Sequence, residues 1–144
     1  MTLPRPVILL TLAVFCSLLV GCGTKYQPVT GEIVYTDGTP VKGLAGGTVA
    51  FQKVGSHMEG AQSEGTNPNG PIDADGKFTL GTMTTTDGAM EGDYTATIAP
   101  PLPSGDEQIP KVIADKYTKF DPSGKTYTVK KGKNHFKIEV EPFK

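Results

Sequence analysis

The feature that most constrains the fold is an alternation of apolar and polar residues over short segments that end in turn residues. The clearest case is Gly92–Ile98, where Tyr94, Ala96 and Ile98 alternate with polar threonines. Successive side chains of a β-strand point to opposite faces, so a period of two predicts a strand with one buried face. Asp-Gly pairs, which suit tight turns, separate such segments and favour short strands over helices.

The same pattern recurs over Val29–Tyr35, Thr48–Val54, Ile72–Leu80, Thr126–Val129 and Asn134–Val140. We expect residues 72–80 to form a hairpin that turns at Asp75-Gly76. We expect the last two segments to form a second hairpin across Lys131-Gly132. About seven short strands without a long helical period predict an all-β fold, an antiparallel sandwich of two sheets.

The alternation also predicts which side chains form the core. The expected inward set is Val29, Gly31, Ile33, Tyr35, Val49, Phe51, Phe78, Leu80, Tyr94, Ala96, Ile98, Phe136, Ile138 and Val140. For Tyr94 we expect a buried ring whose hydroxyl bonds a backbone carbonyl, as in the tyrosine corner of other sandwiches.

Two connections are long. Residues 55–71 are rich in Gly and Asn and are predicted to be a mobile loop between strands. Residues 102–124 could make one or two helical turns starting at Pro110, which suits a first helical position. The apolar residues expected to fold back onto the core from this second connection are Ile109, Val112, Ile113 and Tyr117.

The N-terminal segment has the layout of a secretory signal. Arg5 precedes an apolar run of 14 residues, Val7–Val20, which ends in small residues at Gly21-Cys22. At ~1.5 Å per residue the run spans roughly 21 Å, less than the ~30 Å hydrocarbon core. An uncleaved membrane helix is therefore the less favoured alternative.

These features divide the chain into three parts. We expect a signal peptide over residues 1–21, a lipidated cysteine and tether over residues 22–27, and a sandwich domain over residues 28–144. Cys16 would leave with the signal, so no thiol would be free for a disulfide in the domain. The formal net charge of −1 gives no argument for nucleic-acid binding.

Leu19-Val20-Gly21-Cys22 resembles the lipobox of bacterial lipoproteins. The resemblance implies a diacylglyceryl group on the Cys22 thiol, cleavage just before Cys22 and acylation, such as by palmitate, of the new N-terminus. Two or more acyl chains anchor a protein stably to a membrane. We therefore expect an extracytoplasmic domain tethered to the cell membrane or the outer membrane of a bacterium. The alternative is an ordinary secretory cut that lies near a cysteine.

The ordered motifs of the domain resemble carboxypeptidase regulatory-like domains, which are transthyretin-like sandwiches. The motifs are Val29-Thr30-Gly31-Glu32-Ile33, Gly38-Thr39-Pro40-Val41, Asp75-Gly76-Lys77-Phe78-Thr79-Leu80 and Gly92-Asp93-Tyr94-Thr95-Ala96-Thr97-Ile98. The later stretch from Ile109-Pro110 to Gly132-Lys133-Asn134 is similar to small lipoproteins of planctomycete-type bacteria. The proline that usually precedes the Gly-x-Tyr motif is absent from Met90-Glu91-Gly92. The resemblance implies a transthyretin-like fold and an extracytoplasmic location. It does not imply an enzyme.

The histidines offer little for catalysis or metal binding. His57 has Glu59 and Glu64 nearby, but their spacing matches no metal signature. His135 lies on the face opposite Phe136, where exposure explains it. No Gly-x-Ser-x-Gly elbow occurs, so we predict no catalytic residue, although a site assembled in space stays an alternative.

Two charged stretches have simple structural explanations. Asp73-Ala74-Asp75-Gly76 is similar to the start of a calcium loop but lacks further ligands, so a hairpin turn explains it better. Lys130-Lys131-Gly132-Lys133, with Lys137 beyond, could contact anionic headgroups or acidic glycans. We favour a solvated hairpin tip whose lysines discourage edge-to-edge pairing.

The sequence as a whole predicts a lipid-anchored sandwich that acts as a non-catalytic binding or structural module at the cell envelope, without cofactor or metal. Its partners would be the membrane, through lipid on Cys22, and an envelope protein or glycan. A glycan-binding module and a hydrolytic enzyme are the alternatives. The absence of Trp lowers the case for glycan binding, because such sites commonly expose aromatic rings.

Replacing the cysteine tests the anchor. Cys22→Ala should prevent lipid attachment and leave the precursor uncut, because the modified thiol marks the cleavage site. Membrane fractionation and mass spectrometry of the N-terminal peptide check this. A mutant that is processed and fractionates with membranes like the wild type would contradict the lipobox interpretation.

Overall fold

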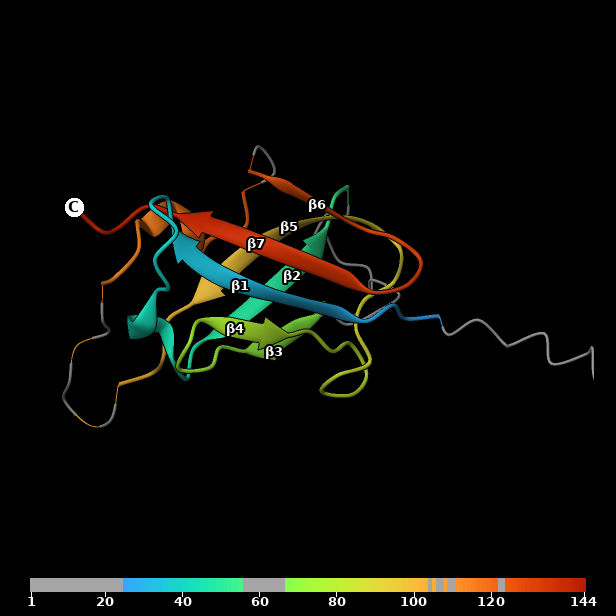
Figure 1. Cartoon of the computed structure of the whole chain (residues 1–144), viewed down its shortest axis with the longest axis horizontal. Coiled ribbons are helices and arrows are strands. Elements are labelled where there is room, and N and C mark those ends of the chain that lie inside the picture. The colour runs from blue at the N-terminus through green and yellow to red at the C-terminus, as the bar shows by residue number, and fades with distance from the viewer. Residues whose placement is uncertain (1–24, 56–66, 104, 106–107, 109–110, 122–123) are drawn as a thin grey trace, which may run out of the picture.

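In the computed structural model, which describes residues 25–55, 67–103, 105, 108, 111–121 and 124–144, the alternating segments pair into two facing sheets (Figure 1). One sheet has the strand order β4-β1-β7, formed by Lys77–Thr79, Val29–Tyr35 and Asn134–Val140. The other has the order β3-β2-β5-β6, formed by Asn69–Pro71, Thr48–Lys53, Gly92–Ala99 and Thr126–Val129. Two short 3-10 turns, η1 (Lys42–Leu44) and η2 (Asp115–Thr118), complete the described elements. The predicted seven-strand sandwich is confirmed.

The first and last strands pair in parallel. β1 and β7 are in register over their whole lengths, from Val29 opposite Asn134 to Tyr35 opposite Val140. The other strand pairs are antiparallel. The sandwich therefore departs from the predicted antiparallel arrangement at this one pair.

The predicted hairpin between β6 and β7 is wrong. β6 pairs with β5, and the chain then crosses to the opposite sheet through residues 130–133. The crossing places the Tyr127 and Phe136 rings against each other across the core, with centroids 5.5 Å apart in an edge-on arrangement. In a hairpin the two inward faces would lie on one sheet, so this contact between layers would be lost.

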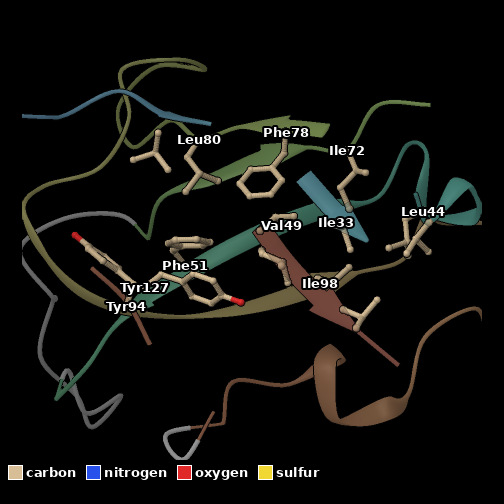
Figure 2. Packing of buried hydrophobic residues seen from close by; sticks show 14 of the residues in the cluster. Ile33, Leu44, Val49, Phe51, Ile72, Phe78, Leu80, Tyr94, Ile98 and Tyr127 are labelled. Carbon is tan, nitrogen blue, oxygen red and sulfur yellow. The ribbon is translucent and has the colours of Figure 1, made fainter. Parts of the chain in front are cut away.

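The predicted core is buried between the sheets. The fully or nearly fully buried members of the inward set are Val29, Ile33, Val49, Phe51, Phe78, Leu80, Tyr94, Ile98, Ile138 and Val140. Tyr35, Ala96 and Phe136 are partly buried against them. Figure 2 shows Phe51 among Phe78, Tyr94 and Tyr127. The alternation thus identified the core-facing side of these strands, although Val34 and Thr95, expected on the opposite faces, are buried as well.

A glycine in the middle of β1 makes close packing between neighbouring strands possible. A Cβ atom on Gly31 would overlap both the Phe78 ring and the backbone carbonyl oxygen of Phe136. Gly31 was expected to face the core, and the structure shows that the Phe78 ring covers it. The inward position is therefore filled by a neighbouring ring rather than by a side chain of its own.

Tyr94 follows the expected tyrosine-corner arrangement. Its ring is 3% exposed, and its hydroxyl donates a hydrogen bond of 2.9 Å to the carbonyl oxygen of Met90. Burial raises the pKa of this hydroxyl. The bond ties the start of β5 to the turn that precedes it.

The two long connections contain more structure than the sequence pattern indicated. Asn69–Pro71, expected to be loop, forms the edge strand β3 against β2, and residues 56–66 lie outside the described residues. The helical turn begins at Asp115 instead of Pro110, which is also outside them. Ile113 is buried, and Val112 and Tyr117 pack partly against the core, so the predicted fold-back is confirmed at these three positions. Ile109, the fourth expected residue, lies outside the described residues.

Truncating the core of β5 should be costly. Ile98 is 1% exposed, so Ile98→Ala should reduce the free energy of unfolding by ~2–5 kcal/mol through lost burial and a residual cavity. The neighbouring Thr97 is unsuitable as a control because it is half-buried and its hydroxyl donates to the Tyr117 carbonyl oxygen. The exposed Thr126 serves instead. Thr126→Ala should change stability by less than about 0.5 kcal/mol. Equal losses for both variants in urea denaturation would contradict the assigned faces.

Candidate functional site

The candidate site is a pocket where the two sheets part beneath η2. β6 and β7 are each the last strand of their sheet, and η2 lies against β5. The space between them measures about 320 Å³, which is within the usual range of ligand pockets. We call it the η2 pocket; its lining residues are Thr95, Ala96, Ile98, Lys116, Tyr117, Lys119, Asp121, Gly124, Lys125, Tyr127, Ile138 and Glu139.

Hydrogen bonds from both sides hold η2 over this space. The Thr97 hydroxyl on β5 donates to the Tyr117 carbonyl oxygen at 3.3 Å. On the other side, the Lys116 ammonium contacts the Glu141 carboxylate at 2.7 Å, and the Ala114 N–H donates to the Glu141 carbonyl oxygen at 3.0 Å. The turn is thus attached both to β5 and to the segment after β7.

Lysines lie beside aromatic rings at the rim of the pocket. The Lys116 ammonium is 5.0 Å from the centroid of the Tyr117 ring, and the Lys125 ammonium is 5.8 Å from that of Tyr127. Both distances permit a cation–π attraction. Asp121 and Glu139 add carboxylates to the same lining, so the pocket carries both signs of charge.

The ion pair between Lys116 and Glu141 holds the Lys116 ammonium at the edge of the pocket and contributes little to the stability of the fold. The hydrogen bond between Lys116 and Glu141 raises the pKa of the ammonium and lowers the pKa of the carboxyl, so both stay charged at neutral pH. Their side chains are 53% and 48% exposed, and such surface pairs contribute little to stability.

Tyr127 supplies a neutral hydroxyl to the pocket. Its side chain is 7% exposed, and burial, followed by the nearby Tyr117 and Glu139, raises its pKa to about 12. The phenol therefore keeps its proton at any physiological pH. It can act as a hydrogen-bond donor but does not supply a phenolate.

The arrangement favours binding of a small polar molecule. Ammonium groups can donate hydrogen bonds, carboxylates can accept them, and the tyrosine rings offer flat apolar surface. No Ser, Cys or His is present among the pocket residues that the structure describes. The lining therefore offers groups that suit recognition of a ligand.

Several residues singled out from the sequence lie outside the described residues. They are Cys22, His57, Glu59 and Glu64. The predictions made for them stay predictions. Within the described ranges, no three His, Cys, Asp or Glu side chains come together in a way that could hold a metal ion. In the same part of the chain, no helix has the length and apolarity needed to cross a bilayer.

His135 lies on the exposed face of β7, as predicted. Its Nδ1 atom is 3.0 Å from the Thr30 hydroxyl on the adjacent position of β1. The pair borders a shallow groove that also includes Asp73 and Lys77. Among the hydrogen bonds of the described residues, none joins a carboxylate to the other ring nitrogen of His135. A hydroxyl beside a histidine is present, but the third group of a triad is not seen.

The acidic turn between residues 73 and 77 is a hairpin turn, as expected. The Asp73 carboxylate accepts hydrogen bonds from the backbone N–H of Asp75 at 2.9 Å and of Lys77 at 2.8 Å. Gly76 has a φ of 76°, which a glycine adopts readily. The carboxylate thus orders the turn itself, and this explains the motif without calcium.

The lysines near the chain end are not at a hairpin tip. Residues 130–133 form the connection that crosses from one sheet to the other, and all are exposed. Lys137 lies on the outer face of β7 opposite Glu32 of β1. The expected role in discouraging edge pairing therefore does not apply to the crossing residues.

Sequence reasoning missed the η2 pocket because its residues come from four separate segments. Adjacent Lys116-Tyr117 and the Lys125-x-Tyr127 spacing are the local signals, since both place a cation beside a ring. Neither spacing shows that the two segments meet. The two segments come together because β6 and β7 belong to different sheets.

The comparisons with known proteins concern the fold. Neither a family model nor a curated protein matches this chain. A solved structure of a DUF3823 family protein from Parabacteroides merdae is 14% identical, with a TM-score of 0.46 over 83% of this chain and 47% of that chain. Another, from Bacteroides ovatus, is 21% identical, with a TM-score of 0.45 over 81% of this chain and 45% of that chain. The chain thus spans less than half the length of either protein.

The raised pKa of Tyr127 predicts a distinct alkaline titration. Its phenol should ionise at about pH 12, so absorbance of phenolate at alkaline pH should include a late component that Tyr127→Phe reduces, since Tyr94, whose pKa is also raised, remains. Because the folded protein disfavours ionisation, the stabilising effect is complete below the ordinary pKa of 10.0 and is lost as the pH rises through the folded pKa. Titration of Tyr127 with the exposed tyrosines, at about pH 10, would contradict its burial.

Proposed function

We propose that the protein is a lipid-anchored, extracytoplasmic binding module that presents the η2 pocket to a ligand at the cell envelope. The observation that carries the proposal is a pocket of ligand size, lined by lysines and tyrosines, at the end of the sandwich away from the N-terminal side. The proposed anchor is lipid on Cys22. The chain between that cysteine and the fold is short, so the anchor would fix which end faces the membrane.

The described N-terminus and η2, which lies over the pocket, are toward opposite ends of the sandwich (Figure 1). Gln27 is bonded to Gly132, just before β7 begins, whereas Ile138 and Glu139 line the pocket near the end of β7. Ile138 is four residues after Asn134, which is about 13 Å along the strand. An anchor on the N-terminal side would therefore leave the pocket accessible from the envelope space.

The chemistry of the pocket favours a sugar-like ligand. Sugars combine many hydroxyl groups with a flat apolar face, and the pocket combines Lys125 and Glu139 with the rings of Tyr117 and Tyr127. Tryptophan is absent from the chain, but the partly exposed Tyr117 supplies ring surface at the position where charged groups converge. A glycan-binding module, which the sequence left as an alternative, is thus the ligand class that we favour.

The proposed domain type is a carboxypeptidase regulatory-like domain of the kind found in small planctomycete-type lipoproteins. The hairpin at Asp75-Gly76 and the strand containing Tyr94 support this assignment, because both motifs take the local structure that the resemblance implies. Such domains accompany other activities, so the proposal includes no catalytic role. The Thr30–His135 pair is the feature that would carry a hydrolytic alternative.

Binding measurements test the proposal directly. The full-length protein, purified in detergent, should bind members of an oligosaccharide panel that includes cell-wall fragments. Tyr117→Ala and Lys125→Ala should each weaken that binding about fivefold, because one removes a ring that the sugar packs against and the other a hydrogen-bond donor, and each such contact contributes ~1 kcal/mol. Lys42→Ala, at an exposed position outside the pocket, is the matched control.

Two outcomes would contradict the proposal. The first is binding that is unchanged in both pocket variants, which would place the ligand elsewhere. The second is hydrolysis of any panel member that is lost in His135→Ala while binding persists, which would make the protein an enzyme.

A further inference from the structure

We propose that the end of the sandwich around residues 130–133 is an electrostatic docking surface for the anionic membrane that carries the proposed lipid anchor. This inference rests on the proposed lipidation of Cys22. We call the surface, formed by Lys25, Lys130, Lys131 and Lys133, the basic end. All four lysines are exposed.

The basic end is attached to the point where the chain enters the fold. The Gln27 side-chain oxygen accepts a hydrogen bond of 2.8 Å from the Gly132 N–H. The Asn134 N–H donates to the Pro28 carbonyl oxygen at 2.9 Å, and Gln27 pairs with Ala89 in a short bridge. Gln27 is only 8% exposed, so it belongs to the fold, although the sequence had placed it in the tether.

One side chain holds the crossing loop in a fixed shape. The Asn134 amide nitrogen donates to the carbonyl oxygens of Lys130 at 2.8 Å and Gly132 at 2.9 Å, and its amide oxygen accepts from the Lys130 N–H at 2.9 Å. These bonds satisfy the loop backbone internally. The lysine side chains are therefore left to project into solvent at this end.

The length of chain before the fold keeps the basic end close to the anchor. Four residues lie between Cys22 and Gln27, so five Cα–Cα steps join them. A fully extended chain covers at most ~3.6 Å per residue, so Gln27 lies within about 18 Å of the anchored cysteine whatever path the chain takes. The crossing loop bonded to Gln27 is consequently held near the membrane surface.

The charge of this end has the sign that an anionic surface attracts. Glu91 and Asp93 are the neighbouring acids; Glu91 accepts a bond from the Gln27 side chain and Asp93 accepts one from the Thr128 hydroxyl. Even with both carboxylates counted, the four lysines leave this end with a net positive charge. Each lysine near an anionic bilayer contributes ~1 kcal/mol of attraction, which fades within a Debye length of ~8 Å at physiological salt. Lipid and lysines together would set the orientation of the domain.

Amine labelling of the lipidated protein tests the inference. Protein isolated from membranes is inserted into vesicles of phosphatidylcholine alone or with phosphatidylglycerol, and labelling at each lysine is read by mass spectrometry. In the anionic vesicles, labelling of Lys130, Lys131 and Lys133 should fall about threefold or more, since ~1 kcal/mol per lysine makes the docked state the majority. High salt should restore the labelling of these lysines. Labelling of Lys42 should be the same in both types of vesicle.

Two variants that each remove three lysines distinguish an effect of the basic end from an effect of the total charge. In Lys130→Gln/Lys131→Gln/Lys133→Gln, the protection of Lys25 by anionic vesicles should be lost. In Lys42→Gln/Lys77→Gln/Lys144→Gln, which alters exposed lysines elsewhere, it should persist. Loss of protection in both variants would show that total charge, rather than the basic end, is responsible, and would overturn the inference.

The same spectra separate failure of the inference from failure of the anchor. A Cys22 peptide without lipid would overturn both. A lipidated peptide with equal lysine labelling in the two vesicle types would overturn the docking surface and leave the anchor standing. Protection by a soluble acidic polysaccharide, but not by anionic vesicles, would assign the surface to an envelope glycan and equally overturn the inference.

Discussion

The contact of Phe51 with aromatic rings of both sheets is the interaction on which the structure most depends. Its side chain is fully buried. Its ring centroid lies 5.4 Å from Tyr127, 5.8 Å from Phe136, 6.0 Å from Tyr94 and 6.4 Å from Phe78. These rings belong to β6, β7, β5 and β4, so one side chain of β2 joins both layers. Without a disulfide in the described residues, burial of this kind has to hold the sheets together.

This core also determines where the candidate site forms. The Tyr127 ring contacts Phe51, and Tyr127 also lines the η2 pocket, so the core fixes one wall of the pocket. Ile138 likewise belongs both to the core and to the lining. The pocket is therefore built largely on strand positions, and the rest of its lining comes from residues 116–121 and 124–125. A scaffold of this type can hold binding groups in place at little conformational cost.

The sequence predicted the features that depend on local pattern. Alternation in β1, β2, β5 and β7 identified their buried faces, and Asp75-Gly76 identified a turn, because side-chain direction and turn geometry are set by a few adjacent residues. The pairing of β7 with β1 was missed, since two adjacent strands joined by Lys131-Gly132 look like a hairpin in sequence. β3 was missed because Asn69-Gly70-Pro71 has no apolar alternation. The η2 pocket could not be predicted, since it depends on which sheet each distant strand joins.

The central claim is that the two ends of the sandwich have different roles, with the basic end toward the membrane and the η2 pocket away from it. Energy transfer from a single fluorophore to an acceptor in the bilayer tests this most directly. The fluorophore would be placed on Lys131→Cys or Lys119→Cys in the membrane-held protein. The account predicts strong transfer from position 131 and weak transfer from position 119. Equal transfer, or stronger transfer from position 119, would contradict it.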